Sequence, residues 1–312
     1  MNSVEVINIV KTYGEVKAVK NVSFEVAKGE LFGLIGPDGA GKTSLFRVLT
    51  TLLLADSGTA TVEGFDVVKD YREIRNRVGY MPGRFSLYQD LTVEENLSFF
   101  ATVFGTTIRE NYDLIKDIYE QIAPFNSRRA GKLSGGMKQK LALCCALIHK
   151  PDVLFLDEPT TGVDVVSRRE FWEMLNKLKK QGITIVVSTP YMDEASLCDR
   201  IALIQDGTVM SINSPDRIVK NFPKTLFAAK ANNIYKLLQD LRRNSEMESC
   251  YAFGEYIHFT VKADDADIVR ISQIAERENH DGLEVKQVIP GIEDCFIRLT
   301  LDSGQKIMDR KK

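Results

Sequence analysis

The sequence predicts an α/β fold, in which a mainly parallel sheet is covered by helices on both faces and a small α+β domain follows. Three observations support this prediction. Strand-like and helix-like segments alternate from residue 4 to residue 204, as they do when crossover helices join parallel strands. The apolar run at 31–35 leads directly into a glycine-rich loop. The length of 312 residues suits one large and one small domain.

The first domain is predicted at 1–214, and its strands follow from short apolar or alternating runs. These runs lie at 4–9, 22–26, 31–35, 59–62, 153–156, 183–187 and 201–204. One face of a helix after the glycine-rich loop is marked by Leu45, Val48, Leu49 and Leu52. The apolar spacing at about 84–150 is helical, so we expect a helical subdomain there. Its apolar positions are Leu97, Phe100, Ala101 and Phe104, then Leu114, Ile115, Ile118 and Ile122, with Pro124 ending the second helix.

The second domain is predicted at 215–312, with the element order of a ferredoxin-like split βαβ fold. The expected elements are a strand at 225–229, a helix with Ile234, Leu237, Leu238 and Leu241, a strand at 256–261, a helix with Ile268, Ile271 and Ala275, and a strand pair at 283–299. His258 and His280 show no convergent partners in the sequence, so we predict packing or surface roles for both.

The composition is that of an ordinary globular protein, and it argues against several functions. Apolar residues make up 44% of the chain, charged residues 27%, and the formal net charge is -2. This balance gives no basic footprint for nucleic acid, so no nucleic-acid partner is expected. No apolar stretch approaches the roughly 18 to 20 residues of a membrane-spanning helix, and residues 1–5 do not resemble a signal peptide. The five cysteines lack metal-site spacing.

The glycine-rich loop fits the Gly-x-x-x-x-Gly-Lys-Thr pattern that binds nucleotide phosphates. Its glycines let consecutive backbone N–H groups point at phosphate oxygens, and the following helix adds the dipole of its N-terminus. Lys42 supplies a positive charge for the β- and γ-phosphates, and Thr43 supplies a hydroxyl for Mg²⁺. The predicted cofactor-binding residues of this segment are Gly36, Pro37, Asp38, Gly39, Ala40, Gly41, Lys42, Thr43 and Ser44.

A second motif, at 153–158, is an apolar strand that ends in Asp157 and Glu158. Phosphoryl transfer needs charge neutralisation and positioning more than covalent help. Asp157 is therefore predicted to act at the metal, together with Thr43. Glu158 is predicted to be the catalytic residue, which acts on the attacking water.

A third motif, at 133–137, reads Leu-Ser-Gly-Gly-Met and begins a helix with Ser134 in the N-cap position. With the first two motifs, it resembles the ATP-binding subunits of ABC transporters. The segment at 290–296, Pro-Gly-Ile-Glu-Asp-Cys-Phe, is similar to the ending of exporter-type, ABC-2-like multidrug efflux ATPases. The resemblance implies a P-loop NTPase core of the ABC ATPase type, ATP and Mg²⁺ as cofactors, and ATP hydrolysis coupled to export.

The resemblance also implies partners. Ser134, Gly135 and Gly136 would clasp the γ-phosphate held by a second ATPase subunit, identical or different, in a head-to-tail dimer. Tyr13 would stack on the adenine. An integral-membrane permease would form the substrate path, so the chain would be cytoplasmic and peripheral on the inner face of the cell membrane. The candidate residues for docking this permease are Phe85, Leu87 and Tyr88, just beyond Gly83, and packing in the core is the alternative role for them.

Two residues that the family uses around the γ-phosphate are missing. Gly83 stands where the family usually has glutamine, and Pro190, which has no N–H, stands where it usually has histidine. Either nearby groups compensate, or this chain carries the slow site of an asymmetric pair. Two further alternatives are a regulatory nucleotide-binding subunit with little turnover, and a soluble ABC protein that acts on ribosomes or DNA.

Overall fold

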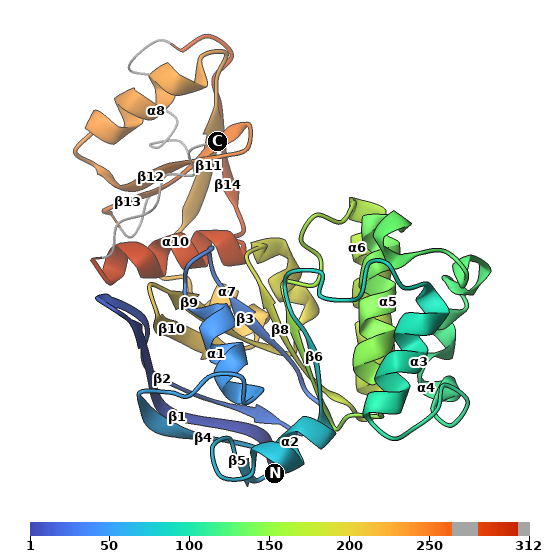
Figure 1. Cartoon of the computed structure of the whole chain (residues 1–312). Helices are drawn as coiled ribbons and strands as arrows, with labels where there is room; N and C mark the ends of the chain where they lie inside the picture. Colours follow the sequence, from blue (N-terminus) through green and yellow to red (C-terminus); the bar gives the residue numbers. More distant parts are fainter. Residues whose placement is uncertain (264–279, 305–312) are drawn as a thin grey trace. The chain divides into compact units, whose positions relative to one another are not determined.

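The computed structural model describes residues 1–263 and 280–304, and it divides the chain into two units (Figure 1). The first unit contains Met1–Asp216 together with residues 299–304, and the second is Arg217–Arg298. The sequence assigns the whole of 215–312 to the second domain, so the two divisions differ at the C-terminal end. The difference has a physical cause: the buried Thr300 hydroxyl donates to Gln205 Oε1 at 2.7 Å.

Two sheets and an intervening helix form the body of the first unit (Figure 1). The antiparallel sheet contains β1 (Asn2–Tyr13), β2 (Val16–Ala27), β4 (Ser57–Val62) and β5 (Phe65–Asp66) in the order β2-β1-β4-β5. The second sheet contains β3 (Leu31–Ile35), β6 (Val78–Met81), β7 (Val153–Asp157), β8 (Thr184–Thr189), β9 (Arg200–Gln205) and β10 (Thr208–Asn213). Its order is β10-β9-β3-β8-β7-β6, and all pairs except β10 with β9 are parallel.

Helix α1 (Lys42–Leu49) fills the space between the two sheets. Its Phe46 is fully buried and meets the ring of Phe155 in β7 edge-on, with centroids 5.7 Å apart. The predicted helical position of Leu52 is wrong, because α1 ends at Leu49 and Leu52 is 57% exposed. Thr51 has φ +63, a left-handed conformation that a β-branched residue rarely adopts and that cannot continue a helix.

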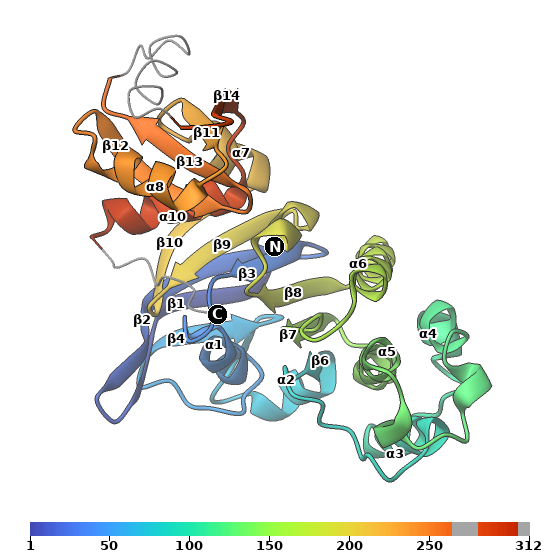
Figure 2. The same cartoon turned by 90° about the horizontal axis from the view of Figure 1, so that it is seen from above.

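Helices α3 (Val93–Val103), α4 (Tyr112–Tyr119), α5 (Gly135–Leu147) and α6 (Val165–Lys180) gather beside the β6 and β7 edge of the parallel sheet, as Figure 2 shows. The predicted helix through Ile122 stops at Tyr119, and Pro124 lies in a separate 3₁₀ turn, Ala123–Phe125. Ile122 is nevertheless buried. The short helix α2 (Tyr71–Arg77) precedes β6. Within the described ranges, no helix is long and apolar enough to cross a membrane.

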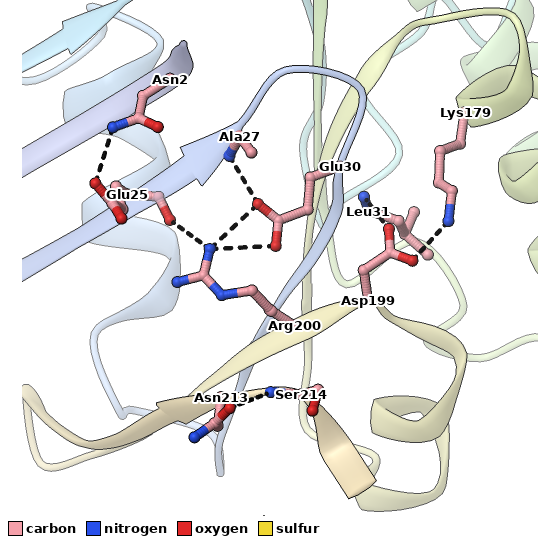
Figure 3. A network of polar contacts seen from close by, with 10 residues as sticks. All are labelled: Asn2, Glu25, Ala27, Glu30, Leu31, Lys179, Asp199, Arg200, Asn213 and Ser214. Carbon is pink, nitrogen blue, oxygen red and sulfur yellow. Dashed lines mark hydrogen bonds and ion pairs between the residues drawn. The ribbon is translucent and has the colours of Figure 1, made fainter. Parts of the chain in front are cut away.

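A network of acidic and basic side chains fixes the starts of β3 and β9 (Figure 3). Glu30, which is 7% exposed, pairs with the Arg200 guanidinium at 3.3 Å. Asp199 accepts the Leu31 N–H at 2.9 Å and pairs with Lys179 at the end of α6 at 2.6 Å. These contacts hold β3 in place beside β9, so that the C-terminal end of β3 delivers the glycine-rich loop to a defined position.

The second unit is a four-stranded antiparallel sheet with helices. Its elements are α7 (Pro215–Lys220, which begins in the first unit), β11 (Leu226–Lys230), α8 (Ile234–Arg243), β12 (Met247–Phe253), β13 (Tyr256–Val261), β14 (Glu284–Val288) and α10 (Ile292–Asp302, which ends in the first unit). The sheet order is β12-β13-β11-β14. β13 is antiparallel to both neighbours, so β11 and β12 are parallel to each other and form a split βαβ unit with α8. The predicted helix with Ile268, Ile271 and Ala275 lies outside the described residues.

The predicted strand pair at 283–299 is wrong, because only β14 is a strand and α10 follows it. Pro290, which lacks an N–H, stands two residues beyond the strand and cannot extend the ladder. Asp294 Oδ2 then accepts the Gly291 N–H at 2.7 Å, which satisfies a free donor at the start of the helix. The segment that resembles the end of exporter ATPases is therefore a helix start.

His258 is 8% exposed, so the predicted packing role is confirmed, but the expectation that it lacks partners is wrong. Its Nδ1 lies 2.7 Å from Asp294 Oδ1, and the Tyr251 hydroxyl donates to the same oxygen at 2.8 Å. His280 Nε2 lies 3.4 Å from Asp240 Oδ2. Burial alone would raise the pKa of Asp294, but the hydrogen bonds from His258, Gly291 and Tyr251 outweigh burial and lower that pKa.

We expect Asp294→Ala to lower the free energy of unfolding of the second unit by about 2 to 4 kcal/mol, because a buried acceptor of three hydrogen bonds is lost. Urea unfolding followed by circular dichroism measures this change. The single tryptophan of the chain, Trp172, lies in the first unit and reports on that unit separately. Glu293→Ala, at the neighbouring carboxylate, is the matched control.

The same carboxylate gives a pH dependence. Because folding lowers the pKa of Asp294, its contribution to stability is present above the unfolded pKa of about 3.9 and disappears as the pH falls through the folded pKa. The difference between the wild type and Asp294→Ala should therefore shrink on acidification. A difference that stays constant down to low pH would contradict the ionised state assigned to Asp294.

Candidate functional site

The C-terminal ends of several parallel strands meet at one edge of the sheet. Leu34 of β3 pairs with Ser188 of β8, and Ser188 pairs with Asp157 of β7. The Gly36 N–H, the first of the glycine-rich loop, donates to Thr189 O at 3.2 Å. In open α/β sheets ligands bind at this edge, so the loop and the acidic strand end form one site.

Two glycines of the loop are required by close backbone approach. A Cβ at Gly36 would lie 2.0 Å from Ile204 O, and a Cβ at Gly41 would lie 2.2 Å from Ala18 O. Gly41 also has φ +98, a conformation that glycine adopts without strain. The loop is therefore seated directly on β9 and β2, which fixes the directions of its N–H groups.

Lys42 is held inside the loop and is only 3% exposed. Its Nζ donates to Gly36 O at 2.8 Å and to Pro37 O at 3.0 Å. The same nitrogen lies 3.2 Å from Glu158 Oε1. The structure thus brings together the predicted phosphate-binding lysine and the predicted catalytic glutamate.

Ser188, which the sequence does not single out, supports both acidic residues at the end of β7. Its hydroxyl donates to Asp157 Oδ1 at 2.6 Å and accepts the Glu158 N–H at 3.1 Å. Glu158 has φ +50, a strained conformation for a non-glycine residue of the kind that occurs at functional sites.

Burial, together with the nearby Asp157 charge, raises the pKa of Tyr80 in β6 to about 12.

Tyr13 lies beside the first turn of α1. Its hydroxyl is 3.3 Å from Ser44 Oγ, and the residue is 44% exposed. Thr43 and Ser44 are both half-buried in that turn. An exposed aromatic ring next to the predicted phosphate-binding helix is suited to stacking on a base, so its place in the structure is compatible with the predicted adenine contact.

Ser134, Gly135 and Gly136 are placed elsewhere, at the N-terminus of α5. Ser134 caps this helix by accepting the Met137 N–H at 3.4 Å. A Cβ at Gly136 would lie 2.9 Å from Ser167 Oγ. Within the described part of the chain, no hydrogen bond or ion pair joins these three residues to the loop at 36–44. They form a second group, in which Ser134 and Gly135 are exposed.

Gly83 and Pro190, which stand where the family usually has glutamine and histidine, both border the candidate site. A Cβ at Gly83 would be 3.1 Å from Asp157 O and 3.8 Å from Asp157 Oδ2, so a longer side chain there would meet the acidic strand end. Pro190 directly follows Thr189, whose carbonyl accepts the Gly36 N–H. Gly83 therefore borders the acidic strand end and Pro190 borders the loop, but neither residue supplies a polar side chain.

A groove of about 450 Å³ lies between the helical region and the β6 segment. Its lining is mainly apolar and includes Tyr80, Phe85, Leu87, Phe100, Val103, Phe104 and His149. Of the three candidate docking residues, Phe85 is half-buried and Tyr88 is 50% exposed outside the groove, whereas Leu87 is 8% exposed and packs as the alternative of a core role predicts. Burial lowers the pKa of His149, whose ring stacks on Phe104 at 3.8 Å.

Comparison with known sequences identifies similar proteins. The sequence profile of the family described as ABC transporter matches residues 19–161. The probable multidrug ABC transporter ATP-binding protein YbhF of Escherichia coli is 43% identical over 215 residues, which are 68% of this chain and 37% of that protein. This chain therefore spans less than two thirds of that relative. The Nod factor export ATP-binding protein I of a Rhizobium species is 34% identical over 306 residues, which cover 96% of this chain and 97% of that protein.

Solved structures have the same core. One described as the ATP-binding subunit of an ABC transporter has a TM-score of 0.64 and 27% identity, covering 70% of this chain and 92% of that one. Another, a dimeric ATP-binding cassette in a post-hydrolysis state bound to ADP and phosphate, has a TM-score of 0.61 and 26% identity, covering 68% of this chain and 98% of that one.

Proposed function

Because this chain belongs to the ABC transporter family of ATP-binding proteins, we propose that it binds and hydrolyses ATP and couples ATP-driven dimerisation to export through a separate membrane permease. One observation carries the proposal: Lys42 Nζ, inside the glycine-rich loop, lies 3.2 Å from Oε1 of Glu158, the residue that follows β7. A phosphate-binding charge and a group able to act on water thus share one site.

Each residue has a distinct role in this proposal. The N–H groups of the loop and the ammonium of Lys42 bind the phosphate oxygens, and Tyr13 stacks on the adenine. Phosphate oxygens compete with Glu158 for Lys42, so nucleotide binding releases the Glu158 carboxylate. The released carboxylate orients the attacking water and accepts its proton.

Thr43 and Asp157 would hold Mg²⁺, since both offer the oxygen ligands that this ion prefers. Asp157 fits this role because Ser188 occupies its Oδ1, while Oδ2 faces the open position at Gly83. Among the described residues, no group of three or more His, Cys, Asp or Glu side chains could hold a metal ion. When bound, Mg²⁺ neutralises phosphate charge.

A second ATPase subunit would complete the site. Ser134 and Gly135 are exposed at the N-terminus of a 13-residue helix, where free N–H groups favour an anion. Val165 and Val166, which begin α6, are 79% and 68% exposed. Such exposed apolar residues are suited to a subunit interface. We propose that Ser134, Gly135 and Gly136 clasp the γ-phosphate bound by that second subunit.

The apolar groove is the proposed docking site for a permease helix, which would hold the chain at the inner face of the cell membrane. Val103 lines this groove and is 60% exposed. We expect Val103→Asp to abolish co-purification of the permease from detergent-solubilised membranes, because a charge in an apolar interface is costly. The purified chain should keep its basal ATPase activity.

Val68→Asp is the matched control, because Val68 is 54% exposed and lies outside the groove. ATPase activity measured with and without the co-purified membrane protein tests the coupling itself. A Val103→Asp chain that retains its membrane partner would contradict the docking site. A wild-type chain that binds ATP but never hydrolyses it, alone or with that partner, would instead favour the regulatory alternative motivated by Gly83 and Pro190.

A further inference from the structure

A buried carboxylate joins two segments of the candidate site. Glu194, in the 3₁₀ segment Met192–Leu197, is 2% exposed. Its Oε1 accepts the Thr160 hydroxyl at 2.7 Å, and its Oε2 accepts the Thr189 hydroxyl at 2.5 Å. Thr160 lies two residues after Glu158, and Thr189 ends β8 directly before Pro190. Each carboxylate oxygen is therefore bound to a different segment that borders the catalytic strand end.

Burying the Glu194 carboxylate costs free energy that an apolar side chain would not cost. A buried carboxylate is costly unless it is paired and hydrogen-bonded, and an apolar side chain of similar size often gives equal or higher stability. Arg168 Nε forms an ion pair with Oε1 at 3.7 Å, which offsets part of the cost of burial but is too long for a hydrogen bond, and the guanidinium stacks on the Tyr191 ring at 4.2 Å. What the carboxylate provides beyond packing is a fixed distance between two hydroxyl groups.

Both hydroxyls bear on the position of Glu158. The adjacent residue Ser188 already fixes Asp157 and the Glu158 N–H. Thr189 accepts the Tyr191 N–H at 3.1 Å, which sets the chain path around Pro190. Neighbouring hydroxyls of β8 thus hold the end of β7 directly and the segment after Glu158 through Glu194.

We propose that Glu194 is a positioning residue for ATP hydrolysis, which clamps Thr160 to Thr189 and so fixes the Glu158 segment against the end of β8. This inference rests on the proposed function. The Glu194 clamp is needed because Pro190, which follows Thr189, has no polar side chain that could hold the end of β8 against the Glu158 segment.

Glu194→Gln tests the clamp with little change of shape, because an amide has one acceptor oxygen and cannot accept both hydroxyls in the same way. We expect kcat of the purified full chain to fall on the order of 10-fold to 100-fold, while the Kd for a fluorescent ATP analogue changes by less than about twofold. Thr160→Val should lower kcat similarly, and the double variant should be no worse than either single variant. Thr189→Ser, which keeps the hydroxyl, should retain activity.

Asp193→Asn is the control, since it makes the same chemical change at an exposed neighbour. A second measurement does not need turnover: amide hydrogen exchange at 158–164 should rise about threefold or more in Glu194→Gln and not in Asp193→Asn. Unchanged exchange in Glu194→Gln overturns this inference, whether or not the wild type hydrolyses ATP. A wild type that hydrolyses no ATP refutes the proposed function instead. Faster exchange with unchanged kcat in an active enzyme also overturns the inference.

Discussion

Lys42→Ala is expected to abolish binding of a fluorescent ATP analogue, with Kd raised at least about 100-fold. The substitution removes the positive charge that we propose binds the phosphates. It also uncovers Glu158, whose Oε1 lies 3.2 Å from Lys42 Nζ, so a negative charge is left beside the incoming phosphates. Fluorescence titration measures this loss, and Lys116→Ala, at an exposed lysine of α4, is the control.

Glu158→Gln should have the opposite profile. It removes a negative charge near the phosphates and leaves the loop intact, so ATP binding is preserved or strengthened. Phosphate release by this chain's own site should fall by about 10²-fold to 10⁴-fold, because the group that accepts the proton is lost. The double variant should bind ATP better than Lys42→Ala alone. Equal loss of binding in both single variants would contradict the assigned roles.

Ser134→Arg is expected to suppress the ATPase activity of a heteromeric complex by about tenfold or more, whereas Glu158→Gln lowers it by less than about twofold. This chain's own site lacks polar side chains at Gly83 and Pro190, yet its Ser134 helix start is intact and exposed. The chain is therefore better equipped to complete a partner's site than to run its own. An arginine at position 134 would block the N–H groups that we propose bind the partner's γ-phosphate.

The measurement is phosphate release by the purified complex, with each variant carried by this chain alone. Ser245→Arg, an exposed serine in the second unit, controls for the added charge and bulk. If Glu158→Gln were the more damaging change, or if this chain reached full activity as a homodimer, the asymmetric arrangement would be refuted. An ordinary symmetric exporter would then be the better description.

The parts of the site that could be predicted from sequence are those whose chemistry is local. The glycine-rich loop can be recognised from adjacent residues, because Gly36 and Gly41 have no room for a side chain and Lys42 follows Gly41 directly. Ser188 and Glu194 could not be found in this way. They reach Asp157 and Thr160 across 31 and 34 residues of sequence, and a hydroxyl in a strand or a glutamate in a turn carries no motif.

The errors in the second unit have a related cause. Apolar residues at 283–299 are compatible with either strand or helix, and the choice is made by Pro290 and by the Asp294 contact with the Gly291 N–H. The pairing of His258 with Asp294 spans 36 residues and depends on that helix start. Once α10 is taken for a strand, neither contact can be anticipated.

The contact between Thr300 and Gln205 affects the order in which the chain can fold during its synthesis. It joins residues 95 positions apart, across the whole of the inserted second unit. At ribosomal rates of about 5 to 20 residues per second, Thr300 is synthesised about 5 to 20 seconds after Gln205. Until then the side chain of Gln205, at the end of β9, lacks this partner, so the first unit reaches its final packing only after the second has been translated.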